Sequence, residues 1–149
     1  MVFTKNVKVK VLVAYWAHNL DGTNQYLDAL SYTNTLCNSS KYNKCRGKVE
    51  IKYFKVPGFN QTGPKLVNGS KVDNIYPSYT RVLHAKYCVS DARVHIGTSN
   101  LVWDYFYTTS GVSFGAYDEA LVSQLQGVFD SDWASPYAFP WQSAESSII

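Results

Sequence analysis

The sequence of 149 residues lacks the long apolar run that a transmembrane helix requires. Its longest apolar stretch, VLVAYWA at 11–17, is far shorter than the roughly 20 residues needed to cross a bilayer. The first residues, MVFTKNVKVKVLV, interleave lysine with valine, whereas a signal peptide presents a continuous apolar block. If the chain resides in an oxidising compartment, we expect its signal or anchor to lie outside this sequence.

Charge of either sign is also scarce. Charged residues make up 17% of the chain, and the net charge is +3. A balance this close to neutral does not indicate a strongly basic surface for nucleic acid, so an anionic substrate would have to be held by local groups. Aromatic residues, in contrast, are abundant, with 12 Tyr, 7 Phe and 4 Trp. We expect most of them to fill a core and some to line a groove for bases, sugars or acyl chains.

Several common motifs of enzymes are missing. The chain contains no P-loop, no G-x-G-x-x-G and no Ser-His-Asp pattern. The spacing of His84, Cys88 and His95 matches no standard set of zinc ligands, so we predict neither a metal nor another cofactor. His18 follows the first predicted strand, and we expect both it and His95 to be structural or exposed.

Cysteine is rare, and two of the three cysteines predict a local disulfide. Cys37 and Cys45 flank the polar loop NSSKYNK, which such a bond would close; two free thiols are the alternative. Cys88 lies in an apolar segment, and we expect it to be a buried thiol.

Three N-x-S/T sequons are present, where roughly one or two are expected by chance. Together with the predicted disulfide, they favour a glycoprotein of a lumenal or secreted compartment, and chance sequons are the alternative. The three acceptor residues are Asn38, Asn60 and Asn68.

Hydrophobic periodicity predicts a mixed α/β domain. Apolar residues alternate over 7–16 and 48–56, as in strands, and recur at helical spacing over 24–36. Strand, helix and strand in this order predict a parallel pair of strands. Residues 57–78 show no periodicity, and we expect them to form a long irregular loop.

The second half of the chain predicts two more strands and a helix. The strands are expected over 80–90 and 92–100, joined by a tight turn, and the helix is expected to start after Asp118 as N-cap. We predict that residues 1–137 form a single lobe and that 138–149 form a loose tail. The apolar stripe of the helix consists of Leu121, Val122, Leu125, Val128, Phe129 and Trp133.

The segment LHAKYCVSDARVHIGTSN, at 83–100, carries the strongest chemical signal. In a strand, His84, Lys86 and Cys88 share one face. An imidazole beside an ammonium is unfavourable when both are buried, and a bound phosphate would satisfy both groups. The alternative is an edge strand with its polar face in water.

The spacing within this segment resembles the signature of the phospholipase D superfamily, in which H-x-K-x4-D is followed by G-S/T-x-N. The stretches VKVKVLVAYWAH, HIGTSN, YFYTTSGVSF and LVSQLQGVFDSDWASPY are similar to the C-terminal half of its lumenal, animal-type members. Those proteins act as acid exonucleases on single-stranded nucleic acid or on lysosomal lipids. The similarity covers roughly residues 7–137, except the loop at 57–78, and implies one lobe of the phospholipase D fold, with a mixed β-sheet flanked by helices. The matching residues are His84, Lys86, Asp91, Gly97, Thr98 and Asn100.

The resemblance implies metal-independent hydrolysis or transfer of phosphodiester bonds. Two H-x-K motifs meet; one histidine attacks phosphorus to form a phosphohistidine, and the other protonates the leaving oxygen. His84 would be nucleophile or general acid, with general acid favoured in a C-terminal half, while Lys86 and Asn100 would hold the phosphate. Thr98 would support them, and Asp91 would support the fold or the motif without direct chemistry.

This chain departs from the family in having only one H-x-K motif. An active enzyme then needs a second half, either an N-terminal half of the parent protein, which the resemblance favours, or a second copy in a symmetric dimer. We predict that a free monomer is inactive. The alternative function is a catalytically inactive member or fragment that binds a phosphate-bearing ligand or a protein. Tyr105 and Phe106, just downstream of Asn100, are expected to stack on a base or a lipid near the phosphate.

The resemblance also implies a compartment, either lysosome, endoplasmic reticulum or the cell exterior. Phospholipid and single-stranded nucleic acid both remain as substrates on the sequence alone.

Overall fold

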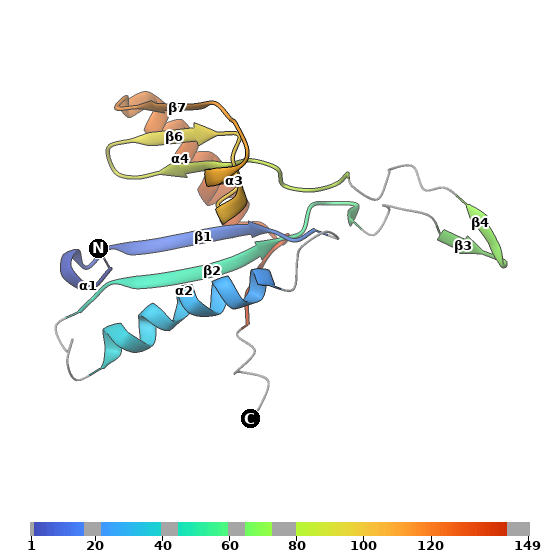
Figure 1. Ribbon diagram of the computed structural model, residues 1–149, viewed down its shortest axis with the longest axis horizontal. Coiled ribbons are helices and arrows are strands. Elements are labelled where there is room, and N and C mark those ends of the chain that lie inside the picture. Colours follow the sequence, from blue (N-terminus) through green and yellow to red (C-terminus); the bar gives the residue numbers. More distant parts are fainter. Residues whose placement is uncertain (1, 17–21, 40–44, 60–64, 73–79, 143–149) are drawn as a thin grey trace. The chain divides into compact units, whose positions relative to one another are not determined.

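The computed structural model describes residues 2–16, 22–39, 45–59, 65–72 and 80–142 (Figure 1). Contacts within the chain separate two compact units, where the sequence led us to expect one lobe. The first unit comprises Met1–Leu83 together with Pro136–Ile149, and the second unit comprises His84–Ser135. Both combine small sheets with helices, so the predicted α/β class is confirmed. No helix in the described part of the chain is both long and apolar enough to cross a membrane.

The first unit is built on the predicted strand–helix–strand unit. Strand β1 (Lys8–Ala14) pairs in parallel with β2 (Lys48–Phe54) along the whole length of both strands. Helix α2 (Gly22–Asn38) connects them and runs along the sheet, as Figure 1 shows. A short helix, α1 (Val2–Lys5), precedes β1. The parallel pair predicted from alternation and helical spacing is therefore confirmed.

The hydrophobic core of this unit lies between α2 and the sheet. Leu27 of α2 packs against Val49 and Ile51 of β2, and all three are buried. Alternation along the strands directs every second side chain toward the helix. Partly buried residues complete the cluster: Val2, Val9, Val11, Val13, Leu30, Tyr53 and Trp141.

The segment after residue 137 adds a third strand to this sheet. Strand β8 (Ala138–Pro140) pairs antiparallel with the end of β2, and the N–H of Trp141 donates to the carbonyl of Ile51 at 3.2 Å. Residues 138–141, which we expected to belong to a loose tail, are held on the sheet in this way. The physical reason is that Trp141 packs on the core, which the local sequence does not reveal. Residues 143–149 lie outside the described residues.

The predicted irregular loop at 57–78 contains a β-hairpin. Strands β3 (Lys65–Val67) and β4 (Ser70–Val72) pair antiparallel around Asn68 and Gly69. These two residues have φ of 51° and 78°. Positive φ at both central positions is the requirement of a type I′ turn, for which Asn-Gly is the preferred sequence. Asn60 and residues 73–79 lie outside the described residues.

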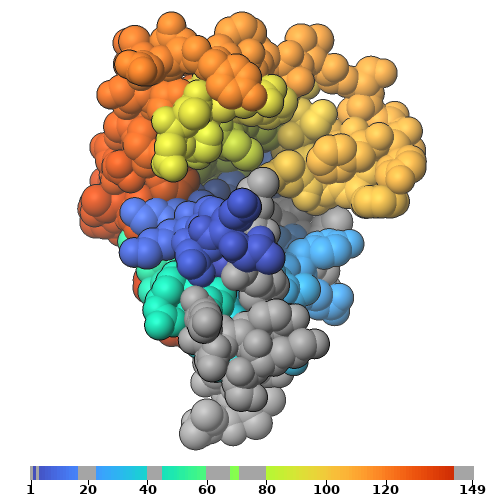
Figure 2. Space-filling model, turned by 90° about the vertical axis from the view of Figure 1, so that its left-hand side faces the viewer, coloured from blue at the N-terminus to red at the C-terminus, as the bar shows by residue number. Residues whose placement is uncertain are grey.

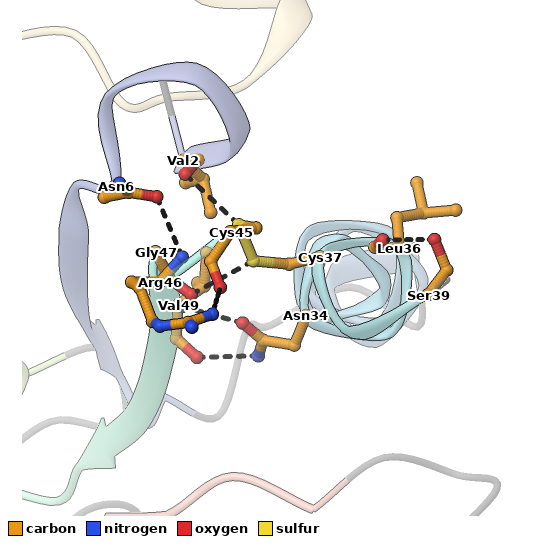
Figure 3. Close-up of a disulfide and its surroundings, with 10 residues drawn as sticks. All are labelled: Val2, Asn6, Asn34, Leu36, Cys37, Ser39, Cys45, Arg46, Gly47 and Val49. Atoms are coloured by element: carbon orange, nitrogen blue, oxygen red, sulfur yellow. Dashed lines mark hydrogen bonds between the residues drawn. A yellow bond between two sulfur atoms is a disulfide. The ribbon is translucent and has the colours of Figure 1, made fainter. Parts of the chain in front are cut away.

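A disulfide joins the end of α2 to the start of β2. Cys37 and Cys45, the pair predicted to close the loop between them, are bonded with their Cα atoms 5.5 Å apart (Figure 3). The backbone N–H of Arg46 donates to Asn6 Oδ1 at 2.8 Å. Figure 2 shows the N-terminal residues, in blue, lying against the turquoise start of β2. The bond therefore fixes the point at which α2, β2 and the N-terminal segment meet.

The second unit is an antiparallel sheet with one long helix. Strands β5 (Tyr87–Val89), β6 (Val94–Gly97) and β7 (Ser113–Ala116) pair in the order β5-β6-β7, and α3 (Trp103–Tyr107) lies between β6 and β7 in the sequence. Helix α4 (Glu119–Ala134) follows. The two predicted strands exist but are shorter than expected, because both pairings end where the chain turns at Thr98.

Helix α4 begins as the sequence predicted. The Asp118 side chain accepts a hydrogen bond from the N–H of Leu121 at 2.8 Å, which is the geometry of an N-cap. Most of the predicted apolar stripe is partly buried, but Val128 is 51% exposed. The buried centre of this unit is Val94 of β6, which has no exposed surface.

Candidate functional site

The β5–β6 hairpin brings the two parts of the predicted motif together. The N–H of Gly97 donates to the carbonyl oxygen of Lys86 at 2.9 Å, one step beyond the last paired residues, Tyr87 and Ile96. The H-x-K segment therefore ends beside the beginning of the G-T-x-N turn. Both parts lie within the second unit.

His84 and Lys86 lie outside regular strand structure. β5 begins only at Tyr87, so the prediction of a strand over 80–90 is wrong for its first half. The reason is that β6 ends at Gly97, after which the N–H of Thr98 donates to the carbonyl of Val112 and the chain no longer continues the ladder with β5. His84 is exposed, which leaves its imidazole accessible from solvent.

The ammonium of Lys86 is hydrogen-bonded to the backbone of the same H-x-K segment. Nζ donates to the carbonyl oxygen of His84 at 2.9 Å. Lys86 is half-buried, and this burial lowers the pKa of its ammonium below the ordinary value. An ammonium has three donors, so the group can hold this carbonyl and still bind an anion. Because Lys86 is partly removed from water, a bound anion stabilises its charged form more than it would stabilise that of an exposed lysine.

Thr98 holds the G-T-x-N turn onto the start of β7. Its Oγ1 accepts from the N–H of Val112 at 3.1 Å, and its own N–H donates to the carbonyl of Val112 at 3.2 Å. Gly111 lies so close that an added Cβ would be 2.5 Å from Thr98 Oγ1 and 2.9 Å from Ser99 Oγ. Thr98 therefore fixes the turn on one side. On the other side, any side chain at position 111 would displace Thr98 or Ser99.

Asn100 ends this turn with its side chain partly buried. Among the residues that the structure describes, none hydrogen-bonds its amide group. An amide with free donors can contribute to holding the oxygens of a phosphate.

Asp91 lies at the other end of the β5–β6 hairpin. The turn there is closed by Ser90, whose N–H donates to the carbonyl of Arg93 at 2.8 Å and whose Oγ accepts from the N–H of Arg93 at 3.1 Å. The length of β5, Tyr87–Val89, separates Asp91 from Lys86. Asp91 is exposed, and its predicted role as a support of the fold remains a prediction.

The face of β5 that carries Cys88 is open. Cys88 lies directly opposite His95 on β6, and both side chains are exposed. The prediction of a buried thiol is wrong, because alternation places Cys88 on the face opposite to Val94, which is the buried one. Within the described ranges, no three His, Cys, Asp or Glu side chains gather closely enough to hold a metal ion.

The two aromatic residues predicted to line the substrate lie on α3. Phe106 is 64% exposed, and Tyr105 is partly buried. The neighbouring rings of Trp103 and Tyr107 contact each other at an interplanar angle of 38°, with their centroids 4.5 Å apart. The helix therefore presents an aromatic surface directly after the turn that ends at Asn100.

Sequence reasoning missed a second group of candidate residues, in the first unit. Tyr15 follows β1, and Lys55 follows β2, so the carboxyl ends of two parallel strands bring them together. Lys55 Nζ lies 5.1 Å from the centre of the Tyr15 ring. The available signal was an aromatic residue and a basic residue near the carboxyl ends of the two predicted parallel strands. This is the edge of a sheet at which α/β proteins bind ligands.

Comparison with known proteins identifies relatives that match nearly the whole chain. No protein-family model matches the sequence. The chain is 34% identical to Phospholipase D Z of Dictyostelium discoideum over 138 residues, which are 93% of this chain and 27% of the relative. It is 31% identical to Phospholipase D Y of the same organism over 141 residues, which are 95% and 26%. It is 33% identical to the 5'-3' exonuclease PLD3 of Xenopus tropicalis over 153 residues, which are 97% and 27%. The chain thus spans about a quarter of the length of these curated relatives.

Proposed function

Because the chain belongs to the phospholipase D superfamily, we propose that it forms one half of a phosphodiesterase that hydrolyses or transfers phosphodiester bonds. The observation that carries this proposal is the hydrogen bond between Lys86 and Gly97, which brings H-x-K beside G-T-x-N. In the alternative, the same residues bind a phosphate-bearing ligand without turnover.

In the proposed chemistry, Lys86 and Asn100 hold the phosphate group of the substrate. Burial lowers the pKa of the Lys86 ammonium, so a bound anion favours its charged form. Lys86 and Asn100, whose amide hydrogen-bonds none of the described residues, bind the non-bridging oxygens as negative charge develops on them. One histidine attacks phosphorus and forms a P–N bond, while the P–O bond to the leaving group breaks. The other histidine gives its proton to the leaving oxygen, and water then cleaves the P–N bond. We assign the proton donor to His84.

The second histidine has to come from outside this sequence. The chain contains a single H-x-K, and it spans only about a quarter of its relatives. We propose that the missing motif belongs to an N-terminal half of the parent protein. A symmetric dimer of this chain is the other arrangement that would supply two motifs.

The substrate is a phospholipid or single-stranded nucleic acid, since the names of the relatives include both phospholipases D and a 5'-3' exonuclease. A lumenal or secreted location is part of this proposal. It is supported by the Cys37–Cys45 disulfide and by two sequons whose acceptors, Asn38 and Asn68, are exposed.

Turnover of bis(p-nitrophenyl) phosphate at acid and neutral pH tests the proposal, together with the mass of the chain in solution. We expect the isolated monomer to be silent and the complex with a second H-x-K half to be active. In that complex, His84→Asn should reduce kcat at least a hundredfold, and Lys86→Met should also reduce it strongly. His95→Asn is the matched control, because His95 is exposed on a neighbouring strand and has no assigned role.

Three outcomes separate the alternatives. Turnover by a pure monomer would overturn the requirement for two motifs. Unchanged kcat in His84→Asn would remove His84 from the chemistry. A complex that binds the phosphodiester without turning it over would support the non-catalytic alternative.

A further inference from the structure

The turn of the β3–β4 hairpin exposes an asparagine whose neighbouring backbone nitrogen is accessible. Asn68 and Gly69 occupy the two central positions of the turn, and both are exposed, as is Ser70. The two strands pair Val67 with Ser70, so the backbone N–H of Gly69 lies outside the ladder. Among the described residues, none hydrogen-bonds the N–H of Gly69 or the side-chain amide of Asn68. The nitrogen of Gly69 and the side-chain carbon of Asn68 are therefore both free to react.

The backbone of the turn requires a glycine at position 69, although its surroundings do not. An added Cβ would meet no atom within 4 Å, but the φ of 78° strains any residue that has a side chain. The same glycine leaves the nitrogen after Asn68 without a neighbouring side chain that would hinder it.

The hairpin around this turn is small. In the described part of the chain, β3 and β4 pair only with each other, and each strand has three residues. A two-stranded hairpin without further strands is marginally stable in water. The turn can therefore open at little cost and let the nitrogen of Gly69 approach the side chain of Asn68.

The charge of the first unit favours a reaction at this nitrogen. The first unit contains twelve lysines and arginines against five carboxylates, a net charge of +7, whereas the second unit contains two against six, a net charge of −4. Loss of the proton from a backbone N–H creates negative charge, and so does conversion of an amide to a carboxylate. A positive surrounding stabilises both.

We propose that Asn68 is a site of spontaneous deamidation. The nitrogen of Gly69 gives its proton to hydroxide and forms a bond to Cγ of Asn68. The Cγ–Nδ2 bond breaks, and Nδ2 takes a proton from water and leaves as ammonia. Water then opens the cyclic imide at Cγ, which yields aspartate, or at the backbone carbonyl, which yields isoaspartate. The reaction uses only water and requires neither the proposed phosphodiesterase activity nor a second half.

Deamidation competes with glycosylation for the same atom. A glycan on the sequon formed by Asn68, Gly69 and Ser70 would be attached to Nδ2. Loss of Nδ2 as ammonia removes the acceptor, and an attached glycan hinders the ring closure. Isoaspartate also lengthens the backbone of a two-residue turn that sets the register of the hairpin. The modified chain therefore has no sequon at this turn, and its isoaspartate form loses the regular pairing of β3 with β4.

Incubation of the unglycosylated 149-residue chain at mildly alkaline pH tests the proposal. Trypsin cleaves after Lys65 and Lys71, so mass spectrometry of peptide 66–71 follows the amide of Asn68. We expect this amide to be lost progressively and the loss to be slower at acid pH. Part of the product should accept a methyl group from an isoaspartyl methyltransferase.

Two asparagines of the same sample are internal controls. Asn6 has a similar φ of 55° but is followed by Val7, whose side chain hinders the attacking nitrogen. Asn38 is exposed, but the N–H of Ser39 donates to the carbonyl of Leu36 at 3.2 Å. Both should keep their amides over the time in which Asn68 loses its own.

Unfolding in urea separates the effect of the turn from that of the sequence. We expect urea to accelerate the loss at Asn68 by no more than about tenfold, because the least stable segments of a protein open at a cost near zero. In a host that glycosylates, Ser70→Ala removes the sequon and retains Asn68 and Gly69. Its peptide should deamidate completely, whereas the glycosylated fraction of the wild-type peptide should keep its nitrogen. Asn68→Gln should remove the reaction.

Loss of the amide at Asn68 no faster than at Asn6 and Asn38 would overturn the proposal. An acceleration by urea far above tenfold would also overturn it, since the turn would then protect Asn68. Equal loss in the glycosylated wild-type peptide and in Ser70→Ala would refute the competition between the two modifications.

Discussion

The carbonyl oxygen of Lys86 accepts a hydrogen bond from the N–H of Gly97 at 2.9 Å. This contact joins the H-x-K segment to the G-T-x-N turn, although β5 itself begins only at Tyr87. The backbone of Lys86 is therefore tied to the G-T-x-N turn. Hydrogen bonds between Thr98 and Val112 hold this turn in place. Changes that shift this turn should reach Lys86 through the backbone.

Two glycines near the turn should differ in their tolerance of alanine. A Cβ at Gly111 would lie 2.5 Å from Thr98 Oγ1 and would break its bond with Val112, whereas a Cβ at Gly97 meets its nearest atoms at 3.6 Å. We expect Gly111→Ala to lower the free energy of unfolding by about 1–3 kcal/mol. Gly97→Ala should lower it by less than about 1 kcal/mol. Urea unfolding followed by tryptophan fluorescence measures both, and equal losses would contradict the prediction.

The Lys86 ammonium should titrate at lower pH than an ordinary lysine, because burial lowers its pKa. The unfolded chain then binds this proton more tightly, so the contribution of Lys86 to stability should rise with pH from the lowered pKa up to the ordinary one. Binding of inorganic phosphate should raise this pKa and should weaken as pH rises through it. Titration of the Lys86 Nζ signal by NMR, assigned with Lys86→Met, measures the pKa with and without phosphate. A pKa at or above the ordinary value in the free chain would refute this.

The disulfide between Cys37 and Cys45 should stabilise the first unit. It closes a loop with a sequence separation of 8, for which the entropy of the unfolded chain predicts about 2.5 kcal/mol. We expect a reducing agent to lower the free energy of unfolding of the wild-type chain by this amount. The double variant Cys37→Ala/Cys45→Ala should show the same loss and no further effect of the reducing agent. A wild-type chain that is insensitive to reduction would rule out the predicted contribution.

The side chain of Asn34 should be essential for the attachment of α2 to β2. Its Nδ2 donates to the carbonyl of Val49, and its Oδ1 accepts from the N–H of Val49, both at 2.8 Å (Figure 3). Because Val49 is 4% exposed, Asn34→Ala would leave two buried backbone groups without partners. We expect a loss of about 2–4 kcal/mol in the free energy of unfolding. Thr35→Ala, at the adjacent exposed position of α2, should change it by less than 1 kcal/mol.

The elements that the sequence predicted correctly depend on local patterns. The alternation of β1 and β2, the spacing of α2 and the Asp118 cap of α4 all involve residues a few positions apart. The β3–β4 hairpin also had a local signal, Asn68-Gly69, but its three-residue strands are too short to show alternation.

The remaining features depend on residues far apart in the chain. β8 exists because it pairs with the end of β2 and is followed by Trp141, which packs on a core built by residues near the N-terminus. The exposure of Cys88 depends on which face of β5 is covered, and alternation alone does not decide this.

The sequence by itself indicated the family, through the six spaced residues from His84 to Asn100, since side-chain chemistry and spacing are properties of the chain alone. Only the tertiary structure showed that Lys86 and Gly97 meet while Asp91 lies at the far end of the hairpin. Only the division into two units revealed that the first unit is basic, although the net charge of the whole sequence is close to neutral. The physical reason is that hydrogen bonding, burial and local field depend on which segments are neighbours in space, and neighbours in space are set by packing between distant parts of the chain.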